Sequence, residues 1–479
     1  MGKFGAALPF MALSLVATME LQAAGRAHPN VVFLIADDLG YKELGSYGQT
    51  KIRTPRLDQM ATEGMRLTQH YSGNPVCATS RCVLMTGRHS GHAFIRDNRE
   101  VKPEGQLPIP DDAITLAELF KQHGYATGAF GKWGLGPMDS TGDPLSQGFD
   151  RFHGYNCQRH AHNFYPKFVW DNHTRVDLEG NTRGLTGKHY APDLYLAAAL
   201  DFIDNYKDQP FFLYFPTIVP HLAIQVPDDS LNEYKGLWDD PPYDGKKGYL
   251  PHPAPRAGYA AMVTRMDSDI GQIFDRLKKY GLDEDTVIVF TSDNGPTYNR
   301  LGGSDSEFFD SAGEFRGLKG SVYEGGMRVP AIVRWPGKVP AGTVSDHLSA
   351  FYDWMPTLMD LIGEPDSTPE VSDGLSFAPE LLGRSEDQKE PEFLYWEFPG
   401  YGGQQALRMG NWKAVRQGLR KHKPGTPLPL ELYDLSTDIS ESKDISTDHP
   451  EVVKKIKELM AKAHAPSKEF PLPALDAAE

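Results

Sequence analysis

The chain has 479 residues, of which 40% are hydrophobic, and its formal net charge at pH 7 is −15. This length predicts two or three domains, and the absence of low-complexity runs and fixed-period repeats excludes a disordered chain and a solenoid. The acidic balance, without a dense lysine and arginine cluster, argues against a nucleic-acid binder, because such proteins must neutralise phosphates.

The amino-terminal residues 1–25 predict a cleaved signal peptide. Lys3 precedes an apolar stretch, and small residues follow that stretch at Ala23 and Ala24. Pro9 interrupts the stretch, and no later segment approaches the roughly twenty apolar residues that a transmembrane helix requires. We therefore expect an exported protein, periplasmic or secreted, without a membrane span.

A series of short apolar runs ends in polar residues, the pattern of buried parallel strands that run into loops. These predicted strands are residues 31–36, 126–130, 211–215, 287–290 and 329–335. Amphipathic helices are predicted at residues 115–122, 193–206, 257–280 and 354–362. The alternation of strands and helices predicts an α/β fold, with a mostly parallel central sheet covered on both faces.

The carboxyl-terminal part has a different pattern. Strands are predicted at residues 392–397, 405–416 and 430–435, and a final helix at residues 451–462. We expect a main domain over residues 26–382 and a smaller α+β domain over residues 383–479. Residues 137–192 are rich in His, Asn, Arg, Gly and aromatics without clear periodicity, which predicts a functional loop region.

Polar side chains follow four of the predicted strands, at the sheet edge where ligands bind in such folds. They are Asp37, Asp38, Lys132, His221, Asp293 and Asn294. The carboxylate and amide oxygens suit a hard cation such as Ca²⁺ or Mg²⁺ rather than zinc. Either acidic pair alone is more typical of a turn, but two pairs at two strand exits predict a metal site.

Residues 73–88 contain Cys77, around which the other polar groups could gather. Thr79 or Ser80 can cap a helix that Gly87 ends, so Cys77 is expected near a helix N-terminus. The helix dipole and Arg81 favour an anion there and would lower the pKa of the thiol. The plain alternative is a turn whose cysteine fills the core. With Cys82 and Cys157 the chain has three cysteines, too few for a disulfide framework.

These stretches resemble the sulfatase family. Residues 77–81, Cys-Ala-Thr-Ser-Arg, followed by Leu84 to Arg88, are similar to its signature C-x-(P/A)-S-R and L-x-T-G-R. Its other blocks are matched in the right order at residues 37–40, 131–133, 220–221, 292–295 and 319–326. The resemblance spans most of residues 30–440.

The resemblance implies an alkaline-phosphatase-like α/β/α sandwich with a smaller C-terminal domain built on an antiparallel sheet. It also implies that a maturation enzyme converts Cys77 to formylglycine during export, and that the hydrated aldehyde, a gem-diol, is the nucleophile. The residue roles that it implies are one Ca²⁺ held by Asp37, Asp38, Asp293, Asn294 and modified Cys77, a sulfate clamp of Lys132 and Lys319, and Arg81 steadying the formylglycine. We add His221 as the candidate acid for the leaving alkoxide, because that oxygen needs a proton.

Two positions depart from the family pattern. Many members have a histidine where this chain has Gly134, and there it contacts the gem-diol, so another group, such as Asp293 or water, must take its proton. Thr79 stands where proline or alanine is usual in the maturation motif, and this departure bears on the extent of Cys77 conversion.

The predicted substrate is a sulfated sugar, and members with similar loops resemble galactose or N-acetylgalactosamine sulfatases. The candidate substrate contacts are His92, Arg96, Asn98, Arg159, His160 and His162, with Tyr395, Trp396 and Glu397 as further candidates. Two alternatives stay open. One is a phosphate or phosphonate ester hydrolase of the same fold, and the other is a catalytically silent binder of sulfated glycan with unconverted Cys77.

Overall fold

A computed structural model describes residues 1–2, 28–102, 104–422 and 426–476. The predicted signal peptide therefore falls almost entirely outside the described residues. Among the residues described, no helix is long and apolar enough to cross a membrane.

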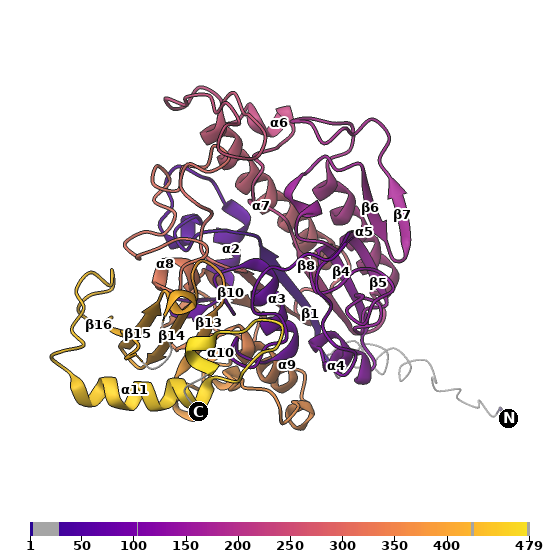
Figure 1. Cartoon of the computed structure of the whole chain (residues 1–479). Helices are drawn as coiled ribbons and strands as arrows, with labels where there is room; N and C mark the ends of the chain where they lie inside the picture. Colours follow the sequence, from indigo (N-terminus) through magenta and orange to yellow (C-terminus); the bar gives the residue numbers. More distant parts are fainter. Residues whose placement is uncertain (3–27, 103, 423–425, 477–479) are drawn as a thin grey trace.

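Ten strands of the described chain form the central sheet, in the order β11-β2-β10-β9-β1-β8-β4-β5-β6-β7 (Figure 1). In that order their bounds are Thr343–Ser345, Met65–Leu67, Ala331–Arg334, Thr286–Ser292, Asn30–Ala36, Phe211–Pro216, Ala126–Lys132, Arg151–Tyr155, Phe168–Asp171 and Thr174–Asp177. The five strands from β9 to β5 run parallel to one another, while β10, β6 and β7 run antiparallel to the strands they pair with.

Strand β1 shows why the sheet needs helices on both faces. Its seven residues are all buried, and successive side chains point to opposite faces. Val31 and Phe33 enter one hydrophobic cluster, whereas Val32 and Leu34 enter the other. A continuous apolar run is therefore satisfied only between two layers of helices, as predicted from the sequence.

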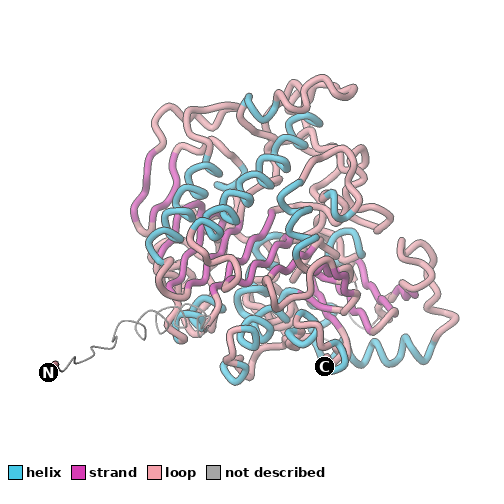
Figure 2. Tube along the Cα trace, turned by 180° about the vertical axis from the view of Figure 1, so that it is seen from behind, coloured by secondary structure: helices cyan, strands magenta, loops and turns pink. Residues whose placement is uncertain are grey.

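Two groups of helices supply these layers, as the view from behind shows (Figure 2). On one face lie α3 (Cys77–Thr86), α4 (Leu116–Gln122) and α9 (Trp354–Leu361). On the other lie α2 (Pro55–Glu63), α5 (Ala191–Tyr206) and α7 (Pro255–Lys279). Thr115 caps α4 through a capping box, in which its side chain accepts from the Glu118 backbone N–H.

A second, antiparallel sheet lies in the carboxyl-terminal part. Its strands are β13 (Leu394–Phe398), β14 (Gln404–Met409), β15 (Trp412–Gln417) and β16 (Glu431–Asp434). Tyr395 and Leu407 pack against Met460 of α11 (Pro450–Ala463), the yellow helix beneath this sheet in Figure 1. Leu394 and Trp396 point the other way, into the main core. The predicted fold class, a mostly parallel sheet with a smaller antiparallel α+β part, is confirmed.

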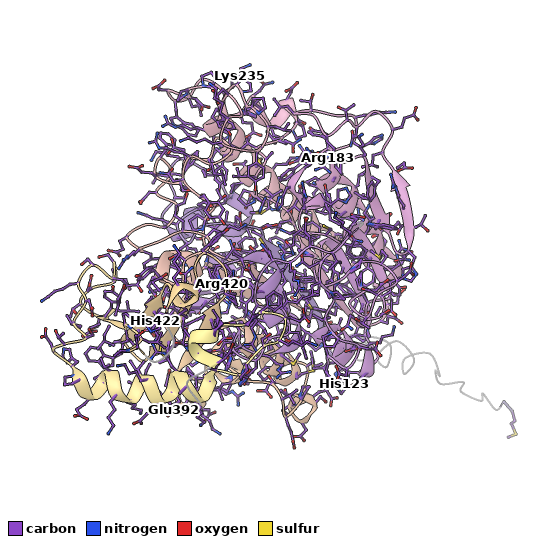
Figure 3. All side chains as sticks on the ribbon, in the orientation of Figure 1. His123, Arg183, Lys235, Glu392, Arg420 and His422 are labelled. Carbon is purple, nitrogen blue, oxygen red and sulfur yellow. The ribbon has the colours of Figure 1, made fainter. Side chains whose placement is uncertain are left out.

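The short remaining elements connect these layers. They are β3 (His70–Tyr71), β12 (Ser349–Ala350), α6 (Asp228–Leu231), α8 (Glu324–Met327), α10 (Ala378–Leu381), α12 (Pro473–Asp476) and the 3₁₀ turns at Gly45–Tyr47, His160–His162, Phe351–Asp353, Pro365–Ser367, Ser385–Asp387 and Leu419–Lys421. Side chains fill the space between these ribbons, and charged ones such as Lys235 and Glu392 stand at the periphery (Figure 3).

Three local predictions were wrong. Residues 405–416 form two strands, because the chain turns at Gly410, which has φ of +55°. The segment 137–192 was expected to be a loop region, but it contains β5, β6 and β7, which extend the central sheet. Neither Thr79 nor Ser80 caps α3, because the helix already begins at Cys77, after Val76.

Candidate functional site

The parallel strands deliver the predicted polar residues to one edge of the sheet. Asp37 and Asp38 follow β1, Asp293 and Asn294 follow β9, and Lys132 is the last residue of β4. All five are at least 99% buried. Since β9, β1, β8 and β4 are neighbours, their carboxyl ends necessarily meet, and the structure brings these residues together.

Three cations neutralise three carboxylates in this cluster. Lys132 Nζ lies 2.6 Å from Asp37 Oδ2, and Arg81 Nη2 lies 2.9 Å from Asp293 Oδ2. Lys319 Nζ lies 2.6 Å from Asp38 Oδ1. Buried charges persist only when they are paired in this way.

These ion pairs also influence the pKa values of the aspartates. Burial opposes the charged form of Asp37, but the buried cations Lys132, Arg81 and Lys319 hold its pKa well below the usual range. Burial and the neighbouring Asp37 charge raise the pKa of Asp293 to about 6. The site therefore contains one firmly ionised carboxylate beside one that protonates more easily.

Cys77 lies at the centre of the cluster, as the first residue of α3. Its Sγ is 3.3 Å from Asp37 Oδ1 and 3.2 Å from Lys319 Nζ, and its exposed fraction is 1%. Asn98, one of the predicted substrate contacts, caps the helix start by accepting from the Ala78 backbone N–H at 3.1 Å. Burial and Asp37 raise the pKa of the Cys77 thiol, and these two effects outweigh the opposing charges of Lys132 and Lys319, so the expected lowering is wrong.

The oxygen atoms at the carboxyl ends of the strands are suitable ligands for a hard cation. Asp37, Asp38, Cys77 and His221 offer ligand atoms that lie within 4.8 Å of one another. Asn294 donates from Nδ2 to Asp38 Oδ1 at 2.8 Å, while its buried Oδ1 has no hydrogen-bond partner among the described residues. A buried amide oxygen without a donor beside two carboxylates is what an oxygen-seeking ion such as Ca²⁺ would satisfy.

His221 lies at the edge of this cluster. Its Nδ1 donates to the Leu222 carbonyl oxygen at 2.5 Å, which leaves Nε2 at 3.6 Å from Asp38 Oδ2. Burial and Lys319 hold the pKa of His221 well below 6.5, so the imidazole is neutral. His162 stacks on it, with ring centroids 4.3 Å apart, so this predicted contact residue is brought to the site.

The other predicted contact residues are engaged in internal pairs. His92 Nδ1 lies 2.9 Å from Asp373 Oδ1, and His160 Nδ1 lies 2.8 Å from Glu104 Oε1. Arg96 pairs with buried Glu397, and Arg159, with 80% of its side chain exposed, lies 3.5 Å from Glu100. Tyr395 and Trp396 are wholly buried. Substrate contact by these residues stays a prediction.

Gln158 is a site neighbour that sequence reasoning missed. A Cβ at Gly134 would lie 1.9 Å from Gln158 Nε2, so the glutamine occupies the room that a side chain at 134 would need. Gln158 is 97% buried, and neither of its amide atoms has a hydrogen-bond partner among the described residues. No periodicity marks this position, because Gln158 lies in the irregular loop after β5.

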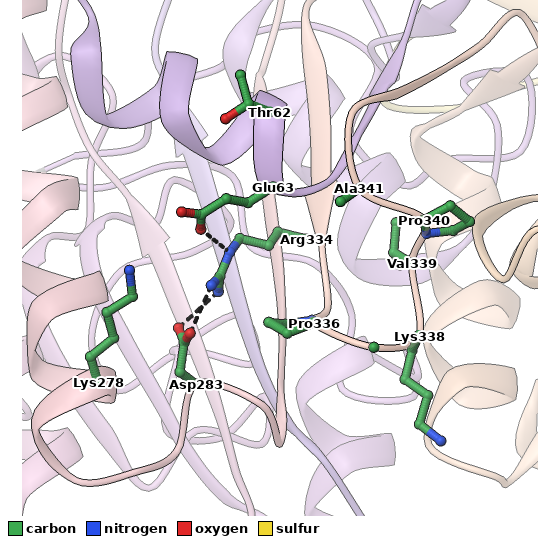
Figure 4. A pocket seen from close by; sticks show the side chains of 11 residues that line it. Thr62, Glu63, Lys278, Asp283, Arg334, Pro336, Lys338, Val339, Pro340 and Ala341 are labelled. Atoms are coloured by element: carbon green, nitrogen blue, oxygen red, sulfur yellow. Dashed lines mark hydrogen bonds and ion pairs between the residues drawn. The ribbon is translucent and has the colours of Figure 1, made fainter.

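A separate hollow lies away from this cluster. It is a cavity of about 800 Å³, and its lining includes Glu63, Asp283 and Arg334 (Figure 4). Glu63 ends α2, Arg334 ends β10, and Asp283 precedes β9. The cavity therefore lies at the amino-terminal end of β9, whereas Asp293 follows the carboxyl end of β9. Arg334 is already neutralised there by Glu63 at 2.7 Å and Asp283 at 2.7 Å. This hollow therefore has no part in the cluster around Cys77.

Comparisons with known proteins agree with the resemblance seen in the sequence. The family model "Sulfatase" matches residues 29–364, and the model "N-sulphoglucosamine sulphohydrolase, C-terminal" matches residues 313–466. The N-acetylgalactosamine-6-sulfatase of Canis lupus familiaris is 33% identical over 402 residues, covering 80% of this chain and 72% of the relative. Arylsulfatase A of Homo sapiens is 32% identical over 492 residues, covering 93% and 90%.

Solved structures show the same arrangement. The structure titled Ps i-CgsB in complex with k-i-k-neocarrahexaose has a TM-score of 0.76 and 26% identity, covering 94% of this chain and 95% of the other. The phosphonate monoester hydrolase of Agrobacterium radiobacter has a TM-score of 0.62 at 21% identity, covering 92% and 99%, and shows the fold alone. Fold, site and relatives together define a sulfuric ester hydrolase. The chain belongs to the sulfatase family.

Proposed function

We propose that this enzyme hydrolyses sulfate esters on sulfated carbohydrates, with Cys77 converted to formylglycine and one Ca²⁺ beside it. One observation carries the proposal. Cys77 begins a helix within 3.3 Å of both an acidic metal-type ligand, Asp37, and a lysine, Lys319. Cys77 Sγ, the precursor of the proposed nucleophile, therefore lies beside both a proposed cation ligand and a proposed anion-binding lysine.

Two groups supply chemistry that the side chains lack. Formylglycine, once hydrated, offers one hydroxyl for attack on sulfur and a second whose deprotonation releases the sulfate. A bound Ca²⁺, held by Asp37, Asp38, Asp293, Asn294 and the modified Cys77, would neutralise charge on the sulfate oxygens.

The residues of this chain bind and orient the ester. Lys132 pairs with Asp37 and Lys319 with Asp38, and both lysines are placed to hold sulfate oxygens. Arg81 donates to Asp293 and to the Lys132 carbonyl oxygen at 2.7 Å, so it fixes both strand exits against α3. Positioning of this kind contributes to catalysis because the ester arrives in line with its nucleophile.

Proton transfers are assigned to His221 and Asp293. The alkoxide that leaves the sulfur needs a proton, and His221 Nε2 is the histidine nitrogen facing the cluster. Burial and Lys319 depress the pKa of His221, so the proposal requires that the negative charge of bound sulfate raise this pKa and allow protonation. Asp293, whose pKa is raised to about 6, is the proposed acceptor for the second hydroxyl, since Gly134 has no side chain.

The proposed substrate class is galactose or N-acetylgalactosamine sulfate in a glycan. The support is the family's N-acetylgalactosamine-6-sulfatases and the similarity to a structure that holds a neocarrahexaose. We place the protein outside the cytoplasm, with a formylglycine-generating enzyme as its maturation partner. A panel of sulfated sugars directly tests whether the substrate sugar is galactose or N-acetylgalactosamine.

The decisive experiment combines maturation and turnover. The full chain is produced by export in a host that contains a formylglycine-generating enzyme. The mass of the peptide that contains Cys77 is measured by mass spectrometry, and sulfate release is measured on a panel of sulfated sugars. We expect the mass of the aldehyde and release that Cys77→Ala abolishes. An intact thiol with no sulfate released would instead support the silent glycan binder, which the departure at Thr79 favours.

A phosphonate or phosphate ester assay addresses the other alternative. The cation–carboxylate cluster suits any tetrahedral oxyanion, so weak hydrolysis of a phenyl phosphonate ester is compatible with the proposal. A kcat/KM for that ester above the value for every sulfated sugar would overturn it.

A further inference from the structure

Two tyrosines stand together beside the sulfate-binding lysine Lys319. Tyr298 lies in the loop after β9, and Tyr401 lies in the turn between β13 and β14. Their hydroxyls are hydrogen-bonded, and their rings meet edge to face with centroids 6.3 Å apart. The pair therefore bridges the loop that follows the central sheet and the edge of the second sheet.

The backbone places this pair next to the cluster. The Lys319 backbone N–H donates to the Pro296 carbonyl oxygen at 2.9 Å, which ties Lys319 to the loop that carries Tyr298. Tyr401 covers Gly320: a Cβ on that glycine would lie 2.2 Å from Tyr401 Cε2, and its φ is +82°. Burial raises the pKa of Tyr298 while the Lys319 ammonium opposes the rise, so the charge of the lysine reaches this phenol.

Tyr401 is held with its ring largely in solvent. Its exposed fraction is 64%, although it packs on Gly320 and meets the Phe398 ring at 5.5 Å between centroids. Its own φ is +49°, a conformation that few residues other than glycine adopt. Packing within the chain does not require a large exposed ring at this position, whereas an aromatic face beside polar groups is typical of a ligand-binding surface.

We propose that Tyr401, oriented by Tyr298, forms a sugar-binding subsite whose ring stacks on a pyranose of the sulfated substrate. The pyranose is the ligand that fits, because its apolar C–H face matches the ring while its sulfate is held at Lys319. The subsite rests on the proposed function, in that the same sugar carries the ester to the cluster. Tyr298 acts through Tyr401 and is a positioning residue.

The test separates sugar binding from sulfate binding. Tyr401→Ala and Tyr401→Phe are compared with wild type for KM and kcat on the best sulfated sugar, and for the inhibition constant of inorganic sulfate. We expect Tyr401→Ala to raise KM about tenfold, with kcat and the sulfate inhibition constant within about twofold of wild type. Tyr401→Phe keeps the ring and should stay within about threefold. Tyr298→Phe, which removes the hydroxyl contact, should give an intermediate KM.

Control variants distinguish loss of the subsite from a general effect of removing a tyrosine. Tyr280→Ala, at the far end of α7, reports the effect of losing a partly exposed tyrosine away from the site. An unchanged KM in Tyr401→Ala, or an equal loss in Tyr401→Phe and Tyr401→Ala, would overturn the subsite. If the matured enzyme turns over no sugar, the same variants are titrated with sulfated sugar in the Cys77→Ala background. Weaker binding in Tyr401→Ala there supports the subsite even though the proposed hydrolysis has failed, and equal binding overturns it.

Discussion

Replacing His221 with glutamine tests the proton that the leaving alkoxide needs. A sugar alkoxide is a poor leaving group without protonation, whereas the phenolate of 4-nitrophenyl sulfate leaves unassisted. General acid catalysis contributes about 10²- to 10⁴-fold, so His221→Gln should lower kcat on a sugar sulfate by about 100-fold or more. The loss on 4-nitrophenyl sulfate should stay below about fivefold, because the lysine clamp and the nucleophile are unchanged.

The pH dependence has a definite sign. A general acid works in its protonated form, and burial and Lys319 hold the pKa of His221 well below 6.5 in the free enzyme. For the sugar, kcat/KM should therefore fall as pH rises through that depressed pKa. Bound sulfate adds negative charge and raises the pKa, so the corresponding fall in kcat should lie at higher pH.

The assay compares wild type and His221→Gln on both substrates across pH. The difference between the two enzymes isolates the histidine from Asp293, whose pKa of about 6 adds a limb of opposite sign. Thermal melting and the inhibition constant for inorganic sulfate check that the buried substitution leaves the fold and the clamp intact. Equal losses on both substrates, or a falling limb that persists in His221→Gln, would refute the assignment.

Three further outcomes are expected. Asp293→Ala should abolish activity and shrink the rise in Tm on adding Ca²⁺, measured by scanning fluorimetry; an undiminished rise would remove Asp293 from the metal site. Gly134→Ala should cost about 1–3 kcal/mol in urea unfolding, because Gly134 has φ of +83° and a Cβ there would lie 1.9 Å from Gln158 Nε2; Gln158→Ala should restore only the part due to that contact. Lys413→Met removes a buried cation that lies 2.8 Å from Glu324 and 3.8 Å from Glu441, and should cost about 1–3 kcal/mol in urea unfolding, because Arg328 and Arg408 still face Glu324. Burial opposes ionisation, but Lys413 and neighbouring arginines lower the pKa of Glu324 to about 2, so its contribution is present above pH 4.5 and is lost as pH falls towards 2.

The residues at the carboxyl ends of the parallel strands show how much of the site could be predicted from the sequence. Buried parallel strands read as continuous apolar runs, and such runs ended within two residues of the observed ends of β1, β4, β8 and β9. Because parallel strands share one carboxyl edge, runs distant in sequence predicted a common location for Asp37, Lys132 and Asp293. The geometry of the cluster thus followed from topology rather than from any local motif.

Packing decided what the sequence could not predict. The pKa of Cys77 depends on burial and on Asp37, which outweigh a dipole argument made from the helix start alone. Strands β6 and β7 have few buried residues and little periodicity, since they lie at the edge of the sheet. Tyr401 and Gln158 are placed by loops whose course depends on contacts across the two sheets, so no spacing in the chain identifies either residue.

The burial of Cys77 also constrains when it can be modified. Cys77 is 1% exposed and Thr79 is wholly buried in α3, so an enzyme that binds this motif in extended form has no access to it in the folded chain. If Cys77 is converted to formylglycine as proposed, the conversion would have to precede the folding of this helix. On this proposal, an unconverted thiol would be buried among Asp37, Lys319 and the helix start, and later exposure to a maturation enzyme would not convert it. We therefore expect Thr79 to affect the competition between conversion and folding, and so the fraction of active molecules, without altering the site of a converted molecule.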